Sequence, residues 1–290
     1  MAVPKVNSSH TRTSSLPSSS HPTLGKVEDY LHLVKSWEVA SPRSTTCGSF
    51  CSGFRNLIEL FLCMDEFLQM PLSQQFLQQK ESHVSQVMDD FLILLDVCGM
   101  VKDSLVQMRE QLQGLSSLFR RRESSFHESI AFYRGIRRRM KKDMTKCLSL
   151  LKSMRSQTSA VRGDDHEVVG SILCDVKDST VSTFELLVQM ISGHKRSASV
   201  LSKLRSIGSR RCEKNEDEVG ENEIERVDEA LRALYACTSS EGERKNEVQI
   251  AERRMVDLEL CLRETEAELD TMFRCLIKAR VFLLNALTAC

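Results

Sequence analysis

The strongest local charge signal in this chain is a run of basic residues between positions 134 and 146. Residues three and four apart lie on one face of an α-helix, so a helix over this run would present a dense cationic face. Such a face can bind a phosphate or an acidic lipid headgroup. The residues of this candidate anion- or lipid-binding face are Arg134, Arg137, Arg138, Lys141 and Lys142.

The alternative is that the basic face pairs with an acidic stripe of the same chain. Asp89, Asp96 and Asp103 recur every seven residues and would line one side of a helix. Lysine plus arginine and aspartate plus glutamate each number 40, so acidic partners are plentiful and the net charge is zero. No aromatic residues interleave with the basic ones, as they do in proteins that bind single-stranded nucleic acid. We therefore favour internal pairing, and we expect no nucleic acid as a partner.

A second short pattern lies in the serine- and proline-rich N-terminus. Arg12 stands three residues before Ser15, and Pro17 stands two after it. This spacing resembles the phosphoserine motif of 14-3-3 proteins, in which an arginine cluster captures the phosphate. The alternative is plain disorder, because such short motifs arise by chance in serine-rich tails.

The residue types that catalysis and metal binding require are present but not grouped. The sequence lacks G-x-S-x-G, H-E-x-x-H, P-loop and G-x-G-x-x-G patterns. Cys47 and Cys51 could share a helix face, but no second pair supplies the other ligands of a zinc site. We predict a protein that is not an enzyme and that uses no metal or cofactor.

The apparent cellular context follows from what the sequence lacks. There is no signal peptide and no apolar span of about 20 residues. We expect a cytoplasmic protein, with peripheral membrane association left open. The eleven cysteines are then expected to be reduced, mostly as small core residues.

Long amphipathic helices must position all these residues. Apolar side chains recur every three or four residues from Val84 to Phe119, and again from Val248 to Ala286. No proline occurs after Pro71. The two stripes match in length and spacing, so the two helices are expected to be neighbours. The pattern predicts an all-α, elongated antiparallel helical bundle with coiled-coil-like long helices and a disordered N-terminal tail.

The expected organisation has two parts. Residues 1–48 form a disordered Ser/Pro-rich tail with a short amphipathic helix at 26–39. Residues 49–290 form the helical bundle domain, with further helices over about 49–69, 125–154, 165–190, 200–207 and from 223 onward. A charged stretch without apolar periodicity, residues 208–222, is expected to be an internal loop.

The most apolar stretch, from Phe273 to Leu287, allows two interpretations. It either belongs to the core or contacts a membrane interface, and three basic residues interrupt it. We favour the core, because the stretch continues the stripe of the last helix without a change of period. The periodicity of apolar residues does not reveal how many chains form the bundle, so a homo-oligomer is also possible.

Several blocks in order resemble the BYPASS-like proteins, a plant-specific family of unknown biochemical function. The blocks are HTRTSSLPSSSHP, LIELFLCMDEFLQMPLSQQFL, VMDDFLILLDVCGMVKDSLVQMREQL, VDEALRAL and LELCLRETEAELDTMFRCLIKARVFLLNALT. Where the family usually has a tyrosine and an acidic residue, this chain has Phe61 and Leu62. The resemblance implies a helical regulatory or interaction protein linked to root and shoot development, with no established active site. We expect it to act through helix-face contacts with other proteins; the alternative is a peripheral protein that binds anionic lipid.

Overall fold

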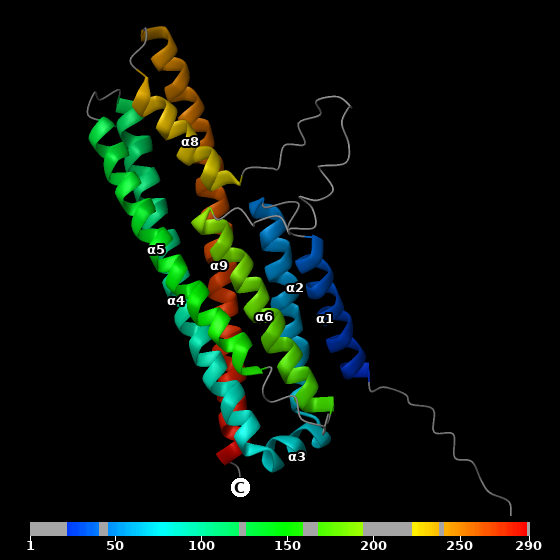
Figure 1. Cartoon of the computed structure of the whole chain (residues 1–290). Helices are drawn as coiled ribbons and strands as arrows, with labels where there is room; N and C mark the ends of the chain where they lie inside the picture. The colour runs from blue at the N-terminus through cyan, green and yellow to red at the C-terminus, as the bar shows by residue number, and fades with distance from the viewer. Residues whose placement is uncertain are drawn as a thin grey trace, which may run out of the picture.

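The computed structural model describes residues 22–40, 46–121, 126–158, 168–193, 222–237 and 241–288. Every element within these ranges is an α-helix, and the helices form an elongated bundle (Figure 1). The predicted all-α fold class is confirmed. The candidate motif Arg12, Ser15 and Pro17, the expected helix at 200–207 and the expected loop up to residue 221 lie outside the described residues.

Two long antiparallel helices form the spine of the bundle. They are α4 (Glu81–Arg121) and α9 (Glu241–Thr288), and their buried stripes are the ones that the sequence predicts. The ion pairs Lys102 to Asp270 and Arg109 to Glu266 fix their relative register. The predicted pairing of the two long helices is therefore confirmed.

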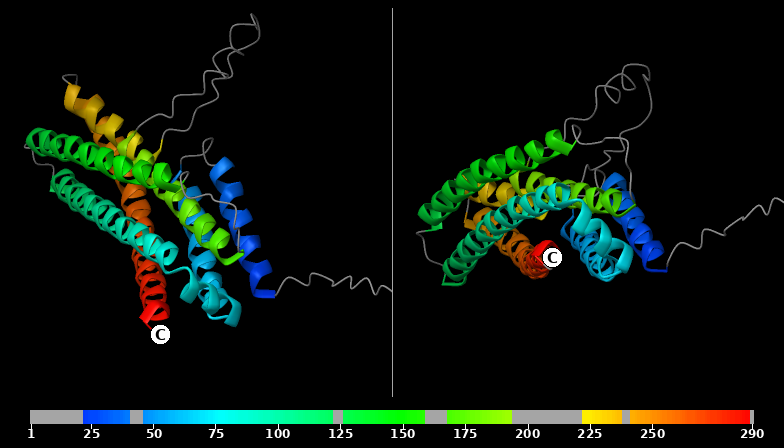
Figure 2. Two further views of the ribbon diagram at one scale, coloured as in Figure 1. Left: turned by 60° about the horizontal axis from the view of Figure 1, so that its bottom comes forward. Right: turned by 90° about the horizontal axis from the view of Figure 1, so that it is seen from below.

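Two further helices cover the other side of α4. Helix α5 (Phe126–Thr158) runs back along α4, and α6 (Val168–Ser192) returns beside α5 (Figure 2). Helix α6 is rich in serine and threonine, which favour helices poorly. Thr180 Oγ1 donates to Val176 O at 2.7 Å, and Thr183 Oγ1 donates to Ser179 O at 2.9 Å. These two threonine hydroxyls are thus satisfied within their own helix and can be buried.

The N-terminal helices form a second layer beside α6 and α9. They are α1 (Pro22–Ala40), α2 (Cys47–Leu68) and the short α3 (Pro71–Gln79). Trp37 of α1 donates through Nε1 to Ser49 O at 2.9 Å. Its ring lies so close to α2 that a Cβ atom on Gly53 would come within 2.2 Å of it. Only glycine permits this approach, so α1 is seated on α2 by a specific contact.

A disulfide joins the N-terminus of α2 to the middle of α9. Cys47 and Cys261 are bonded, with their Cα atoms 5.7 Å apart. The expectation that all cysteines are reduced is therefore wrong for this pair, and Cys47 is not free to ligate zinc together with Cys51. Spacing along the chain could not reveal the bond, because the two residues are 214 positions apart.

Helix α8 (Glu223–Ala236) packs on the first half of α9.

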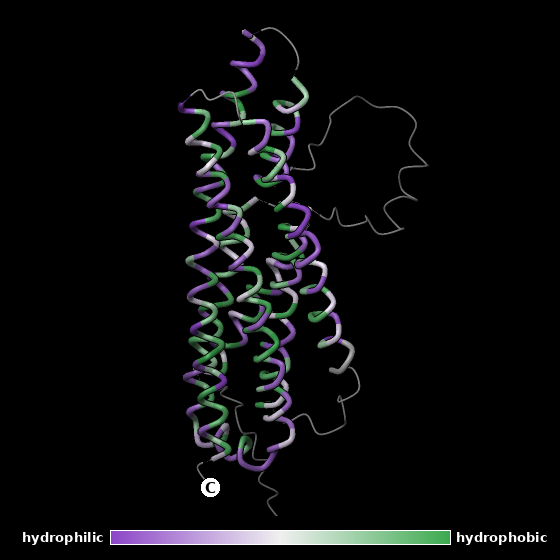
Figure 3. The backbone as a smooth tube through the Cα atoms, turned by 90° about the vertical axis from the view of Figure 1, so that its left-hand side faces the viewer, coloured by the Kyte–Doolittle hydropathy of each residue, from purple (hydrophilic) through white to green (hydrophobic). Residues whose placement is uncertain are grey.

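Apolar and polar segments alternate along every helix, as amphipathic helices require (Figure 3). The expected C-terminal core is confirmed only on one side of α9. Leu276, Ala279, Leu283 and Ala286 are buried, whereas Phe273, Ile277, Val281 and Leu284 are 37–49% exposed.

Candidate functional site: a basic cleft between α5 and α8

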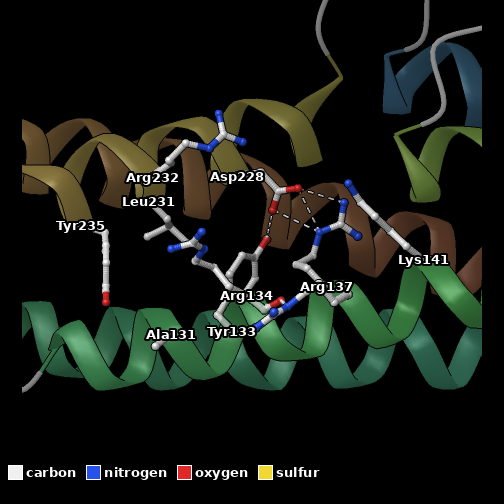
Figure 4. Close-up of a pocket in the computed structure, with 10 residues that line it drawn as sticks. Ala131, Tyr133, Arg134, Arg137, Lys141, Asp228, Leu231, Arg232 and Tyr235 are labelled. Carbon is white, nitrogen blue, oxygen red and sulfur yellow. Dashed lines mark hydrogen bonds and ion pairs between the residues drawn. The ribbon is translucent and has the colours of Figure 1, made fainter.

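The basic run of α5 lies opposite α8, and a cleft of about 500 Å³ separates the two helices (Figure 4). Among the described residues, five cationic side chains and a single carboxylate line it. Apolar and aromatic side chains complete the walls. The lining residues are Ala131, Tyr133, Arg134, Arg137, Arg138, Lys141, Asp228, Leu231, Arg232 and Tyr235.

Helix periodicity decides which α5 side chains enter the core and which stay at the rim. Tyr133, Ile136 and Met140 are buried at spacings of three and four. Arg134 and Lys141 fall outside the stripe formed by Tyr133, Met140 and Met144, and they are exposed. The same spacing places cations in a row along the mouth of the cleft.

Helix α8 is held in place by its N-cap. Asn222 accepts a hydrogen bond through Oδ1 from Glu225 N at 2.8 Å. It also donates through Nδ2 to Met190 O at 3.1 Å, near the end of α6. Capping and docking thus depend on one buried side chain, and they fix where Asp228 faces α5. Asn222 was expected to be the last residue of a loop; it is the capping residue of a helix.

The floor of the cleft is a buried ion pair with unusually complete hydrogen bonding. Arg137 donates to the carboxylate of Asp228 through Nε at 3.1 Å and through Nη2 at 3.0 Å. Tyr133 Oη donates to the same carboxylate at 2.9 Å. The remaining Nη1 of Arg137 donates to Ile191 O at 3.1 Å. Each nitrogen of the Arg137 guanidinium and both oxygens of Asp228 therefore have a strong hydrogen-bond partner.

The chemistry of this floor is not that of a proton-transfer site. Burial, and next the negative charge of Asp228, raise the pKa of Tyr133 well above its usual value. Its hydroxyl therefore stays protonated and serves as a donor. Asp228 already accepts from two side chains, so it is not a free base. The arrangement is rigid and structural.

Above this floor, three cations remain without a carboxylate partner among the described residues. They are Arg134, Arg138 and Lys141, all exposed at the rim. The guanidinium of Arg134 lies 5.4 Å from the ring centroid of Tyr235, a cation–π distance. Arg232, by contrast, is paired with Glu229 of its own helix. The cleft therefore holds excess positive charge, and it could bind an anion.

The structure divides the sequence-based candidate face. It gathers Arg134, Arg138 and Lys141 around one cleft, buries Arg137 beneath them, and places Lys142 on the exposed surface of α5 outside the lining. The prediction that Arg137 belongs to a free anion-binding face is therefore wrong. Its position four residues after Tyr133 and three before Met140, in the buried stripe, is the physical reason.

The favoured internal pairing with the acidic stripe of α4 also needs correction. Asp89, Asp96 and Asp103 lie exposed on the outer side of α4. The described acidic partners of the α5 cations are instead Asp143 of α5, Glu185 of α6 and Asp228 of α8. Asp228 and Tyr235 were not singled out in the sequence, although Asp228 directly follows the buried Val227 of the α8 stripe.

Outside the cleft, the described titratable side chains form no stronger candidate site. Among the described residues, no three histidine, cysteine or acidic side chains lie close enough to hold a metal ion. Within the same ranges, no helix combines the length and the hydropathy needed to cross a bilayer.

Comparison with protein families gives a match over most of the chain. The model of the family described as Protein BPS1 matches residues 53–286, which run from α2 to the end of α9. This region contains both helices that form the cleft. No curated protein and no solved structure matches the chain.

Proposed function

The chain belongs to the BPS1 family, and we propose that it is a non-enzymatic regulatory protein of plant root and shoot development that acts by binding. In this proposal the α5/α8 cleft receives an acidic or phosphorylated segment of a partner protein. The family membership supports the role in plant development. The observation that supports the binding site is the row of three unpaired cations above a floor that is already neutralised.

The non-enzymatic part of the proposal rests on the state of the groups in the cleft. The carboxylate of Asp228, the one found in the described lining, already accepts hydrogen bonds from Arg137 and Tyr133, and the Tyr133 hydroxyl keeps its proton. Arginine does not exchange protons near neutral pH. The cleft can hold negative charge, and its described lining contains no free carboxylate, histidine, cysteine or serine that could act as a general base or nucleophile.

A binding measurement tests the cleft directly. The probe is a fluorescent peptide with two phosphoserines among acidic residues, titrated with the full chain at several salt concentrations. We expect Arg134→Glu/Arg138→Glu to weaken binding at least about tenfold and to flatten the salt dependence. Lys142→Glu/Lys152→Glu is the matched control, because it reverses two exposed α5 charges that do not line the cleft. An equal loss of affinity in both variants would show only general charge attraction and would rule out the proposed site.

The same variants serve in the cell. Affinity purification from root and shoot tissue under phosphatase inhibition should recover partners with the wild-type chain and with the control, but not with the cleft variant. If the cleft variant retains the partner set, the cleft is not the contact site. Arg137 must be left intact in these experiments, because its buried pair holds α8 in place.

An anionic lipid is the second candidate ligand. Tyr235 and Leu231 line the cleft beside its cations, and tyrosine at the edge of a basic site is frequent where proteins meet headgroups. Sedimentation with phosphatidylserine vesicles would separate the two candidates. Salt-sensitive vesicle binding that is lost in the cleft variant would favour the lipid, whereas binding of the peptide alone would favour a protein partner.

We also propose that phosphorylation of Ser15 recruits a 14-3-3 protein. A separate proposal is that this BPS1-family chain acts in the cytoplasm. The support for 14-3-3 recruitment is the spacing of Arg12, Ser15 and Pro17. A Ser15→Ala bait should lose 14-3-3 proteins while it keeps partners that depend on the cleft. Recovery of 14-3-3 proteins by both baits would contradict the assignment.

A further inference from the structure

The C-terminal part of α9 presents an apolar stripe to solvent. Phe273, Ile277, Val281 and Leu284 are 37%, 41%, 49% and 45% exposed. Their spacings of four, four and three keep them on one side of the helix. The opposite side of the same segment is buried in the bundle. Such a stripe on a two-faced helix is typical of a surface that packs against a second protein.

Helix α4 extends this stripe sideways. The ion pair of Lys102 with Asp270 fixes the antiparallel register, and continuing it down the bundle brings Leu92 and Leu95 beside Ile277. Leu92 is 44% exposed and Leu95 is half-buried. Figure 2 shows α4 and α9 adjacent along their length, with α5 on the far side of α4. We call Leu92, Phe273, Ile277, Val281 and Leu284 the α4/α9 face.

The two edges of the α4/α9 face carry opposite charges. The outer edge of α4 is acidic and consists of Asp89, Asp96 and Asp103, all exposed. The α9 edge carries Arg274 and Lys278, also exposed, and no aspartate or glutamate occurs between residues 271 and 288. Lys278 is paired with Asp65 of α2 at 2.8 Å, so Arg274 is the cation available on that edge.

This charge layout is complementary to itself. A two-fold axis parallel to the helices would lay α4 of one copy against α9 of the other, so each acidic edge would meet a basic edge. Along the bundle, the register places Asp96 at about the height of Leu276, within one helical turn of Arg274. An axis perpendicular to the helices would instead bring acidic edge to acidic edge.

We propose that the α4/α9 face is a dimer interface, and that its occupant is a second copy of this chain. The apolar centre supplies the burial, and the edges select the parallel two-fold arrangement. An anionic membrane fits less well, since the acidic edge of α4 would be held against it. The face lies at the other end of the bundle from the α5/α8 cleft, so the proposal does not rest on the proposed function.

Charge reversal provides a strict test in the full-length chain. Asp96→Arg and Arg274→Glu should each weaken dimerisation at least about tenfold, measured by analytical ultracentrifugation. Each homodimer would then juxtapose like charges at both symmetric contacts. A mixture of the two variants should form the heterodimer, because one contact is the wild-type pair and the other is the reversed pair. The double variant Asp96→Arg/Arg274→Glu should recover dimerisation for the same reason.

The apolar centre needs its own variant. Ile277→Gln should weaken the dimer, whereas Leu260→Gln, at an exposed leucine about five turns earlier on α9, should leave it unchanged. Circular dichroism confirms that each variant folds. A wild-type chain that remains monomeric at high concentration overturns the proposal, as does a dimer that mixing fails to rescue. A monomer whose vesicle binding is lost with Ile277→Gln would assign the face to a membrane instead.

Discussion

Among the described residues, two ion pairs with little exposure to solvent connect helices of the bundle, and they are built differently. Arg137 and Asp228, at the cleft, are joined by paired donors, and both ends find further partners in Tyr133 and Ile191 O. In the interior, Lys177 Nζ lies 3.5 Å from Asp90 Oδ2, and Gln86 approaches the same carboxylate only at 3.5 Å.

The difference shows what burial requires of a charge. A guanidinium presents a planar fork that matches a carboxylate, whereas an ammonium is a single point of charge. Desolvation is costly for either pair, and only good geometry repays it. Burial correspondingly raises the pKa of Asp90, against the lowering effect of Lys177 and Gln86. The Arg137 pair is thus a rigid support, whereas Lys177 Nζ lies 3.5 Å from the carboxylates of both Asp90 and Asp178 and forms a close contact with neither.

The largest effect is expected from breaking the better pair. Arg137→Met leaves the carboxylate of Asp228 without its main partner in a half-buried site and should lower the free energy of unfolding by about 3–5 kcal/mol. Chemical denaturation measures the loss. Arg138→Met, which removes an exposed neighbour, should change stability by less than about 0.5 kcal/mol. Similar losses in the two variants would mean that the buried pair has no special structural role.

The disulfide allows the ionic connections to be compared with a covalent one. Cys47→Ser should lower the free energy of unfolding by about 2–4 kcal/mol, because the bond closes a loop of more than 200 residues in the unfolded chain. The measurement is denaturation with and without a reductant. The wild-type and variant curves should converge under reducing conditions. If they coincide under oxidising conditions as well, the bond is absent in solution.

A third acidic group, Glu38, is half-buried, and Arg155, Lys35 and a hydrogen bond with Ser182 compensate its charge only in part. Burial raises its pKa to about 7, opposed by Arg155 and Lys35. The folded state then holds the proton more tightly than the unfolded chain, whose value is near 4.5. Stability should therefore fall as pH rises from about 4.5 through about 7, by about 1 kcal/mol after allowance for solvent screening. Glu38→Gln should remove this slope in denaturation experiments; an unchanged slope would assign it to another group.

These connections also show where sequence interpretation succeeds and fails. The stripes of α4 and α9 were readable because each is a local repeat, and so was the row of Arg134, Arg138 and Lys141. The partner of Arg137 was not, since Asp228 is 91 residues away and its position depends on how Asn222 docks α8 on α6. The disulfide between Cys47 and Cys261 could not be predicted for the same reason. Spacing describes one helix at a time, whereas these sites form between helices.

The smallest effect is expected from removing the weaker pair as a whole. Replacing it with apolar residues, as Asp90→Leu/Lys177→Met, should change the free energy of unfolding by less than about 1 kcal/mol, because the desolvation cost disappears together with the attraction. Lys177→Met alone should lower the free energy of unfolding more, since it removes the cation nearest to the buried carboxylate of Asp90.

The single variant Lys177→Met should also become more stable as pH falls. The folded pKa of Asp90 lies above its unfolded value, so the folded state takes up the proton first. A double-mutant cycle measured at two pH values separates these terms. If the double variant loses as much stability as Arg137→Met, the geometric difference between the two pairs has no energetic counterpart.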